Sequence, residues 1–95
     1  MHGITLQQLR YFDAVVAQGS FHAAASKLHR THPTVCAAIS SLEQQLGFEL
    51  LDRKGYRVAL TEAGRSFHAR VRQVLQAAED LQRFADVIAR GECSE

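Results

Sequence analysis

The first hydrophobic pattern of the chain predicts a helix that begins at Thr5 and ends at Gly19. Thr5 stands three residues before Gln8, which is the spacing of a capping box. Apolar residues then return at steps of three and four, as helical periodicity requires, at Leu6, Leu9, Phe12 and Val16. Gly19 ends the pattern, because glycine enters the left-handed conformation without a steric cost.

Two further helices follow without a linker. Ser20 caps the second, whose apolar face repeats at i, i+3, i+4 and i+7 until the pattern breaks at His29. Thr31 caps the third, Pro33 lies in its first turn, where a missing N–H costs nothing, and Gly47 ends it. The stripe expected to be buried on this third helix consists of Val35, Ala38, Ile39, Leu42 and Leu46.

Residues 48–61 change to a period of two, which predicts a short β-hairpin with its turn at Lys54-Gly55-Tyr56. Alternation directs Val58 and Leu60 inward, and Arg57 and Ala59 outward.

From Thr61 the chain returns to a helical pattern and keeps it until Gly91. Its apolar positions form a heptad seam, spaced alternately by four and three residues, at Phe67, Val71, Val74, Ala78, Leu81, Ala85 and Ile88. We expect this seam to pack along the same helix of a second chain rather than on a globular core, since about 30 Å of seam at 1.5 Å per residue exceeds what the preceding residues cover. The alternative, a helix lying back over its own domain, stays open.

Composition narrows the class of protein. The chain has 95 residues, of which 46% are hydrophobic and 22% charged, as in a single folded domain, and it has no apolar run that spans a bilayer. Its two cysteines, Cys36 and Cys93, lie far apart, which favours a reducing cytoplasm over a disulfide scaffold. Net charge is +1, with six basic and four acidic residues in 1–57 against five and six in 58–95. The charge alone does not predict a nucleic-acid partner.

The order of elements does predict one. Two short helices joined by a tight turn, followed by a hairpin, define a winged helix-turn-helix, which places its recognition helix in the DNA major groove. Lys27 and Arg30 flank the turn, while Arg53, Lys54 and Arg57 lie on the hairpin, where cations can meet phosphates. Winged helices also bind proteins, so this class alone leaves two functions open.

A set of residues spread over about residues 4–90 has the identities and spacing of a known family of proteins. They are Phe12-x-x-Val15, Gly19-Ser20-Phe21, Ala24-Ala25-x-x-Leu28-His29, Pro33-x-Val35-x-x-x-Ile39-x-x-Leu42-Glu43-x-x-Leu46-Gly47, Leu50-x-x-Arg53 and Leu60-Thr61-Glu62-Ala63-Gly64. This pattern closely resembles the N-terminal DNA-binding domain of LysR-type transcriptional regulators.

The resemblance implies a mainly α fold: a winged helix-turn-helix of three helices and a short β-hairpin wing in residues 1–61, then a long dimerisation helix in 62–90. Residues 91–95 would be a tail at the start of an effector domain absent from this chain. That domain is expected to bind a small-molecule effector, whereas no cofactor or metal is expected in residues 1–95. The implied protein is a bacterial, cytoplasmic regulator that binds double-stranded promoter DNA at a partly palindromic site as a homodimer. A higher oligomer of the full-length protein stays open.

Position-by-position comparison with the family, together with the helix-turn-helix motif, indicates which residues are candidates for DNA binding. They are Ser20, Lys27, Arg30, Thr31, His32, Pro33, Thr34, Cys36, Ala37, Ser40, Ser41, Arg53, Lys54 and Arg57. The family usually has Gln at His32, Ser or Thr at Cys36, longer polar residues at Ala37 and Ala38, and often Arg or Gln at Ser40 and Ser41. The recognition helix therefore has short side chains at these contact positions, and we expect more of its specificity to come from DNA shape.

Several other interpretations compete with this one. His29, His32 and Cys36 invite a metal site but supply too few ligands of dependable geometry. Cys36 near a helix N-terminus suits a redox sensor, although such a cysteine more often serves as a small neutral residue. An enzyme is not expected, because no nucleophile–base pair and no phosphate loop stand out. The remaining alternative is a dimerisation or protein-interaction module with little DNA specificity.

Overall fold

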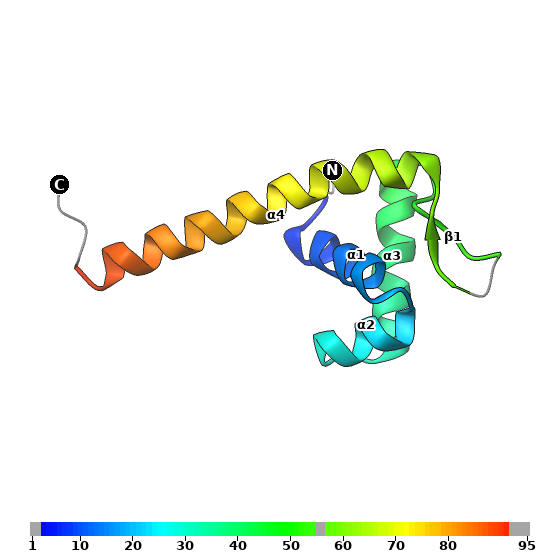
Figure 1. Ribbon diagram of the computed structural model, residues 1–95, viewed down its shortest axis with the longest axis horizontal. Coiled ribbons are helices and arrows are strands. Elements are labelled where there is room, and N and C mark those ends of the chain that lie inside the picture. The colour runs from blue at the N-terminus through cyan, green and yellow to red at the C-terminus, as the bar shows by residue number, and fades with distance from the viewer. Residues whose placement is uncertain (1–2, 55–56, 92–95) are drawn as a thin grey trace.

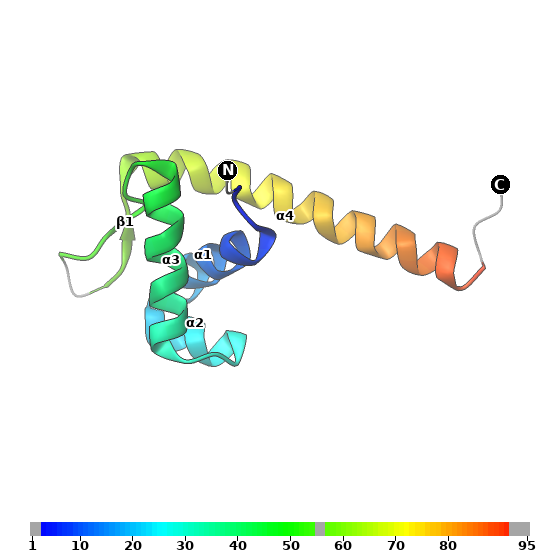
Figure 2. The same ribbon diagram turned by 180° about the vertical axis from the view of Figure 1, so that it is seen from behind.

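The structure, a computed structural model, describes residues 3–54 and 57–91 and confirms the mainly helical fold with a two-stranded hairpin. Four α-helices and two β-strands follow one another as α1 (Leu6–Gln18), α2 (Phe21–Leu28), α3 (His32–Leu46), β1 (Leu51–Asp52), β2 (Ala59–Leu60) and α4 (Glu62–Ala89). The molecule measures 53 × 27 × 24 Å. In Figure 1, α4 extends to the left from a cluster of the three short helices, while the hairpin projects to the right. Figure 2 shows the same arrangement from behind.

The predicted helix ends are confirmed by their hydrogen bonds. At α1, the Thr5 hydroxyl accepts the Gln8 amide N–H at 3.1 Å, and the Gln8 side chain accepts the Thr5 N–H at 3.0 Å, which completes the capping box. The Ser20 hydroxyl accepts the amide N–H of Ala23 at 3.0 Å, three residues along the chain. Gly19 ends α1 with φ 80°. Local sequence signals thus determine where these helices start and stop.

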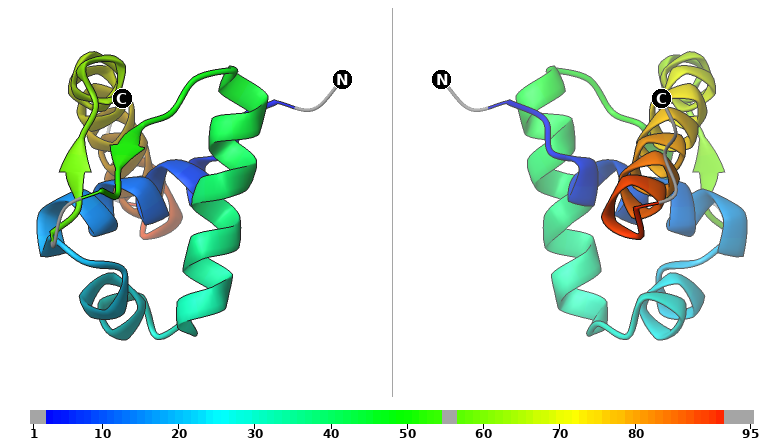
Figure 3. Two further views of the ribbon diagram at one scale, coloured as in Figure 1. Left: turned by 90° about the vertical axis from the view of Figure 1, so that its right-hand side faces the viewer. Right: turned by 90° about the vertical axis from the view of Figure 1, so that its left-hand side faces the viewer.

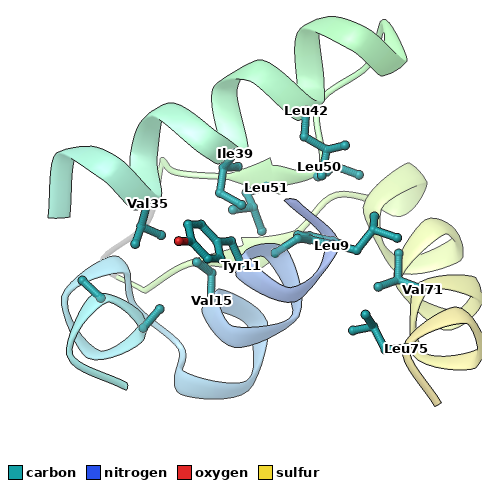
Figure 4. Packing of buried hydrophobic residues seen from close by; sticks show 13 residues of the cluster. Leu9, Tyr11, Val15, Val35, Ile39, Leu42, Leu50, Leu51, Val71 and Leu75 are labelled. Carbon is teal, nitrogen blue, oxygen red and sulfur yellow. The ribbon is translucent and has the colours of Figure 1, made fainter. Parts of the chain in front are cut away.

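The core lies where α1 is surrounded by α2, α3, the hairpin and the first half of α4. Figure 3, seen along α4, shows α3 standing to one side of α1 and the hairpin to the other. Ala24 and Ala25 are buried on α2, where their small side chains permit close approach of another helix. The larger buried side chains, most of which Figure 4 labels, are Leu9, Tyr11, Phe12, Val15, Val35, Ile39, Leu42, Leu50, Leu51, Val71 and Leu75.

The hairpin is short and antiparallel, with Leu51 paired to Leu60 and Asp52 to Ala59. Val58 and Leu60 are half-buried against the core while Arg57 and Ala59 are exposed, so the predicted alternation is confirmed. The predicted turn residues Gly55 and Tyr56 lie outside the described part of the chain.

A tight junction ties the hairpin to α4. Thr61 donates its hydroxyl to the Glu49 carbonyl at 2.7 Å and its N–H to the Leu50 carbonyl at 3.0 Å. Gly64, in the first turn of α4, is buried against the same backbone, because a Cβ at this position would come within 2.1 Å of the Leu50 oxygen. This close approach fixes the direction in which α4 leaves the hairpin.

The heptad seam of α4 is divided between two environments, which corrects one expectation. Val71 is 2% exposed within the core, and Phe67 is half-buried against it. These two positions pack on their own domain rather than on a second helix, because α1 lies alongside the first half of α4. Further along, Leu81 and Ile88 are 67% and 52% exposed. Val74, which is 44% exposed, and this later part of the seam are free for another chain.

Candidate nucleic-acid interface

The turn between α2 and α3 forms without glycine. His29 takes the left-handed conformation, with φ 59° and ψ 42°, and its N–H and that of Arg30 bond back to the last turn of α2. Histidine is among the non-glycine residues enriched in this region. The chain then reverses directly into Thr31, which caps α3. The helix-turn-helix geometry is therefore present despite the missing glycine.

One face of α3 remains uncovered beside this turn. Val35, Ile39 and Leu42 are buried toward α1 and α2, so the rest of the helix points outward. Of the predicted contact residues on α3, Pro33, Thr34, Ala37, Ser40 and Ser41 are either exposed or half-buried, and His32 and Cys36 also keep part of their surface open. The structure brings them together on a single outward surface.

The threonine hydroxyls at the start of α3 already have partners. The Thr31 oxygen accepts the Thr34 amide N–H at 3.3 Å, and the two hydroxyl oxygens lie 2.7 Å apart. Both residues thus stabilise the helix start, and either hydroxyl can exchange this bond for one to an approaching acceptor.

His32 is surrounded by aromatic and sulfur groups. Its ring lies 4.4 Å from the ring of His22 and 5.9 Å from that of Phe21, and the Cys36 sulfur is 3.6 Å from Nδ1. Sequence reasoning missed His22, which carries no local signal beyond its place in the first turn of α2. In the described residues, no group of three or more histidine, cysteine or acidic side chains could hold a metal ion.

The wing base is anchored by an acid, Glu43, to which the sequence pattern assigned no role. Glu43 on α3 accepts the N–H groups of Leu50 and Leu51 at 2.7 and 3.2 Å through one oxygen. Its other oxygen pairs with Arg53 at 3.4 Å, and the Arg53 guanidinium lies 5.2 Å from the Phe21 ring centroid. Arg53 is thereby directed to the side of α3 that carries His32, and its side chain is still 46% exposed.

The other predicted cations occupy three different places. Arg57 reaches the junction of α1 and α2, since a Cβ on Gly19 would lie 2.8 Å from its Nη2 atom. Lys54 is exposed on the hairpin, where its N–H donates to Asp52 at 3.0 Å. Lys27 instead lines a hollow between α1 and α4, together with Asp13 and Glu79. Of the residues lining that hollow, none belongs to α3, and the DNA contact expected of Lys27 stays a prediction.

On the opposite flank of α3 from Arg53, a cleft of about 820 Å³ opens between α1 and the first half of α3. Its walls are mainly polar, formed by Gln7, Gln8, Tyr11, His29, Arg30, Thr31, Thr34, Ala37, Ala38 and Ser41. Here Arg30 donates its Nε hydrogen to the Tyr11 hydroxyl at 3.0 Å. Tyr11 was not among the predicted site residues.

The second half of α4 exposes an apolar stripe wider than the predicted seam. Phe84 is 56% exposed and lies three residues after Leu81 and four before Ile88, so it widens the stripe by one position. Arg83, the residue before Phe84, and Asp86, two residues after it, are charged. The heptad count missed Phe84 because the seam passes through Ala85 instead.

Fold and surface together define a winged helix-turn-helix domain with an outward-facing recognition helix and a long helix after the wing. Residues 6–65 match the family model of bacterial regulatory helix-turn-helix proteins of the lysR family. The chain belongs to this family. Across its described residues, no helix is long and apolar enough to cross a membrane.

Similar proteins are described as HTH-type transcriptional regulators. An uncharacterized HTH-type transcriptional regulator of Azotobacter vinelandii, from an ibpB-leuC intergenic region, is 46% identical over 82% of this chain and 54% of its own length. The probable HTH-type transcriptional regulator YhaJ of Escherichia coli K12 is 40% identical over 93% of this chain and 30% of its own. The chain thus spans 30% to 54% of the length of these regulators.

Several solved structures superpose closely on this chain. The BenM DNA-binding domain in complex with catB site 1 DNA superposes with a TM-score of 0.90 at 34% identity, covering 97% of this chain and 99% of that one. The CbnR DNA-binding domain in complex with DNA gives 0.82 at 34% identity, covering 90% and 99%. Full-length OxyR C199D of Pseudomonas aeruginosa gives 0.85 at 29% identity, covering 90% of this chain but 29% of that one.

Proposed function

We propose that this chain is a sequence-specific DNA-binding domain of a LysR-type bacterial transcriptional regulator. The observation that carries the proposal is the uncovered face of α3, held by a buried apolar stripe on its other side and flanked by Arg30 and Arg53. A recognition helix in a major groove lies between two phosphate strands, so a cation on each flank suits this position. The likeness to two domains solved with DNA supports the same role.

In this proposal α3 enters the major groove by its N-terminal half, and the wing lies on the backbone or in the adjacent minor groove. Thr34 and His32 contact bases, while Arg53, Lys54 and Arg57 contact phosphates. Ala37 can touch a thymine methyl but cannot hydrogen-bond to a base. DNA shape and deformability therefore supply much of the specificity.

The proposed assembly is a homodimer on a partly palindromic site, joined through the exposed apolar stripe of α4 from Val74 onward. Val74, Leu81, Phe84 and Ile88 are the large apolar side chains that α4 leaves exposed in the described part of the chain. The regulator works in the bacterial cytoplasm, and an effector-binding domain following α4 in the full-length protein would take a small molecule.

Selection from a random duplex pool at about 100 mM salt tests the proposal, because non-specific phosphate binding is already weakened there. We expect an enriched inverted repeat. On the enriched duplex, Arg53→Ala should weaken binding to all sequences and lower the salt slope by about 0.9, whereas Thr34→Ala or His32→Ala should change the base preference. An unchanged affinity and salt slope for Arg53→Ala would show that the wing does not contact DNA.

A second candidate is a dimerisation or protein-interaction module with little intrinsic DNA specificity. The short side chains at Ala37, Ser40 and Ser41 and a net charge of +1 favour it. An intact dimer that binds no duplex at low salt would support this candidate over the first.

A further inference from the structure

Tyr11 on α1 places a hydroxyl group at the edge of the recognition surface. The residue is 7% exposed, and Figure 4 shows its ring among core side chains with the oxygen directed toward the Val35 end of α3. Burial of the ring leaves the hydroxyl little freedom to move. It opens into the cleft between α1 and α3, where it is the one phenolic group of the described lining.

This hydroxyl holds Arg30. The Arg30 Nε hydrogen is donated to the Tyr11 oxygen at 3.0 Å, and Gln7 donates to the same oxygen at 3.4 Å. A guanidinium carries five N–H donors in a planar fork, so the bond to Tyr11 engages one and leaves the two terminal NH2 groups for a ligand. A side chain held in this way loses less conformational entropy when it binds.

The surroundings of Arg30 suit an anion. The described residues that line the cleft include the hydroxyls of Thr31, Thr34 and Ser41, and none of them carries a carboxylate. On the other flank of α3, Arg53 is held in a comparable way over the ring of Phe21. Each side of the exposed helix face therefore presents an arginine oriented by an aromatic residue of another helix.

We propose that the cleft between α1 and α3 receives a backbone phosphate of the bound duplex. Arg30 contacts this phosphate, and Tyr11 holds Arg30 in the position for that contact. This inference rests on the proposed function and adds to it a defined phosphate subsite and a positioning residue on α1, outside the helix-turn-helix. The Arg30 NH2 groups donate to the phosphate oxygens, as is usual for arginine. Arg30 and Arg53 would then contact the two strands that border the same major groove.

The test uses the duplex enriched by selection, with single phosphates replaced one at a time by neutral methylphosphonate. At one position, replacing the phosphate by methylphosphonate should lower the affinity of the wild-type domain. The same replacement should not change the affinity of the Arg30→Ala variant. Arg30→Ala should also lower the salt slope by about 0.9, as expected for one lost phosphate contact. Arg10→Ala is the matched control, because Arg10 is an exposed arginine next to Tyr11 in the sequence but lines the separate hollow with Lys27 and Glu79.

Tyr11→Phe separates positioning from packing, since it keeps the ring and removes only the hydroxyl. We expect a loss of affinity of about 2- to 10-fold in the wild-type background, the range of one net hydrogen bond, and none when Arg30 is already replaced by alanine. Gln7→Ala, which removes the other bond to the Tyr11 oxygen, should leave affinity close to wild type. Urea unfolding of each variant reports on folding separately.

Two results would overturn the inference. One is a Tyr11→Phe loss of affinity that is the same in the wild-type background and in the Arg30→Ala background, which indicates a structural role only. The other is an Arg30→Ala variant that loses affinity on methylphosphonate replacement at every position at which the wild-type domain loses affinity. If the wild-type domain itself enriched no duplex, the proposed function would fail, and that result is distinct from both.

Discussion

The two halves of α4 carry one heptad pattern in two different environments. In the first half, Val71 and Leu75 are buried in the domain core, and Asp13 on α1 bonds to His68 at 2.8 Å and to Arg72 at 2.9 Å. In the second half, no tertiary contact covers Leu81, Phe84 or Ile88 within the described residues, and these side chains are exposed by more than half. The pattern is continuous, yet only the first half has neighbours.

This difference shows what a hydrophobic period can and cannot specify. A heptad repeat states that a helix has an apolar face, but the neighbouring elements decide whether that face belongs to a core or to an interface. Here α1 is long enough to cover α4 as far as Leu75, although the seam residue Val74 is already 44% exposed. Beyond that point the apolar stripe needs a second chain, which the proposed dimer supplies.

The largest expected effect is at the start of the covered half. Gly64→Ala should destabilise the domain by about 3 kcal/mol or more, because its Cβ would overlap the Leu50 carbonyl oxygen and the backbone must shift. Urea unfolding followed by circular dichroism measures this. Gly3→Ala is the control, since an added Cβ there has nothing within 4 Å. Equal stabilities for the two variants would contradict the tight junction.

A second pair compares the two halves directly. Val71→Ala should lower the free energy of unfolding by about 2 kcal/mol, because it leaves a cavity in the core. Ile88→Ala should change the stability of the monomer by less than about 0.5 kcal/mol, as is usual for an exposed position. Unfolding at low protein concentration, where dimer formation contributes least, makes the comparison. A cost at Ile88 as large as that at Val71 would mean that the second half is also packed on its own domain.

The third prediction concerns association. Leu81→Lys should weaken the dimer at least about tenfold, because a charge would be buried in an apolar interface, and leave the unfolding midpoint of the monomer nearly unchanged. Gln82→Lys adds the same charge at the next residue, beside Asp86, and should leave association close to wild type. Sedimentation equilibrium measures both. A dimer unaffected by Leu81→Lys would place the interface elsewhere.

The smallest expected effect compares two exposed ion pairs. Arg72 joins α4 to Asp13 on α1, whereas Arg83 pairs with Asp80 within α4 itself. Arg72→Ala should cost about 0.5–1 kcal/mol of stability and Arg83→Ala less than that, because exposed pairs are weak and only the first links two elements. Thermal unfolding of both variants in low salt resolves the order. The reverse order would show that the link to α1 adds nothing.

Local signals in the sequence were sufficient for the helix ends and the hairpin. Thr5, Ser20 and Thr31 cap helices as predicted, since a cap depends only on residues within one turn. The inward and outward alternation of residues 57–60 follows from strand geometry in the same way.

Contacts between distant residues could not be predicted in this way. Glu43 binds the backbone of the wing base, His22 meets His32 across the helix-turn-helix, and Tyr11 holds Arg30. Each of these contacts depends on how two helices, or a helix and the hairpin, are placed in space. Two expectations remain predictions. One is the domain boundary between residue 61 and residue 62, and the other is the list of residues that contact DNA.

The most direct test of the central claim is the affinity of the domain for the enriched duplex and for a scrambled duplex of the same composition, at the same salt concentration. We expect the enriched duplex to bind about 10³-fold more tightly, the lower end of the range for specific recognition, because α3 offers few long polar side chains. Equal affinities for the two duplexes would contradict it and would leave α3 without a sequence-reading role.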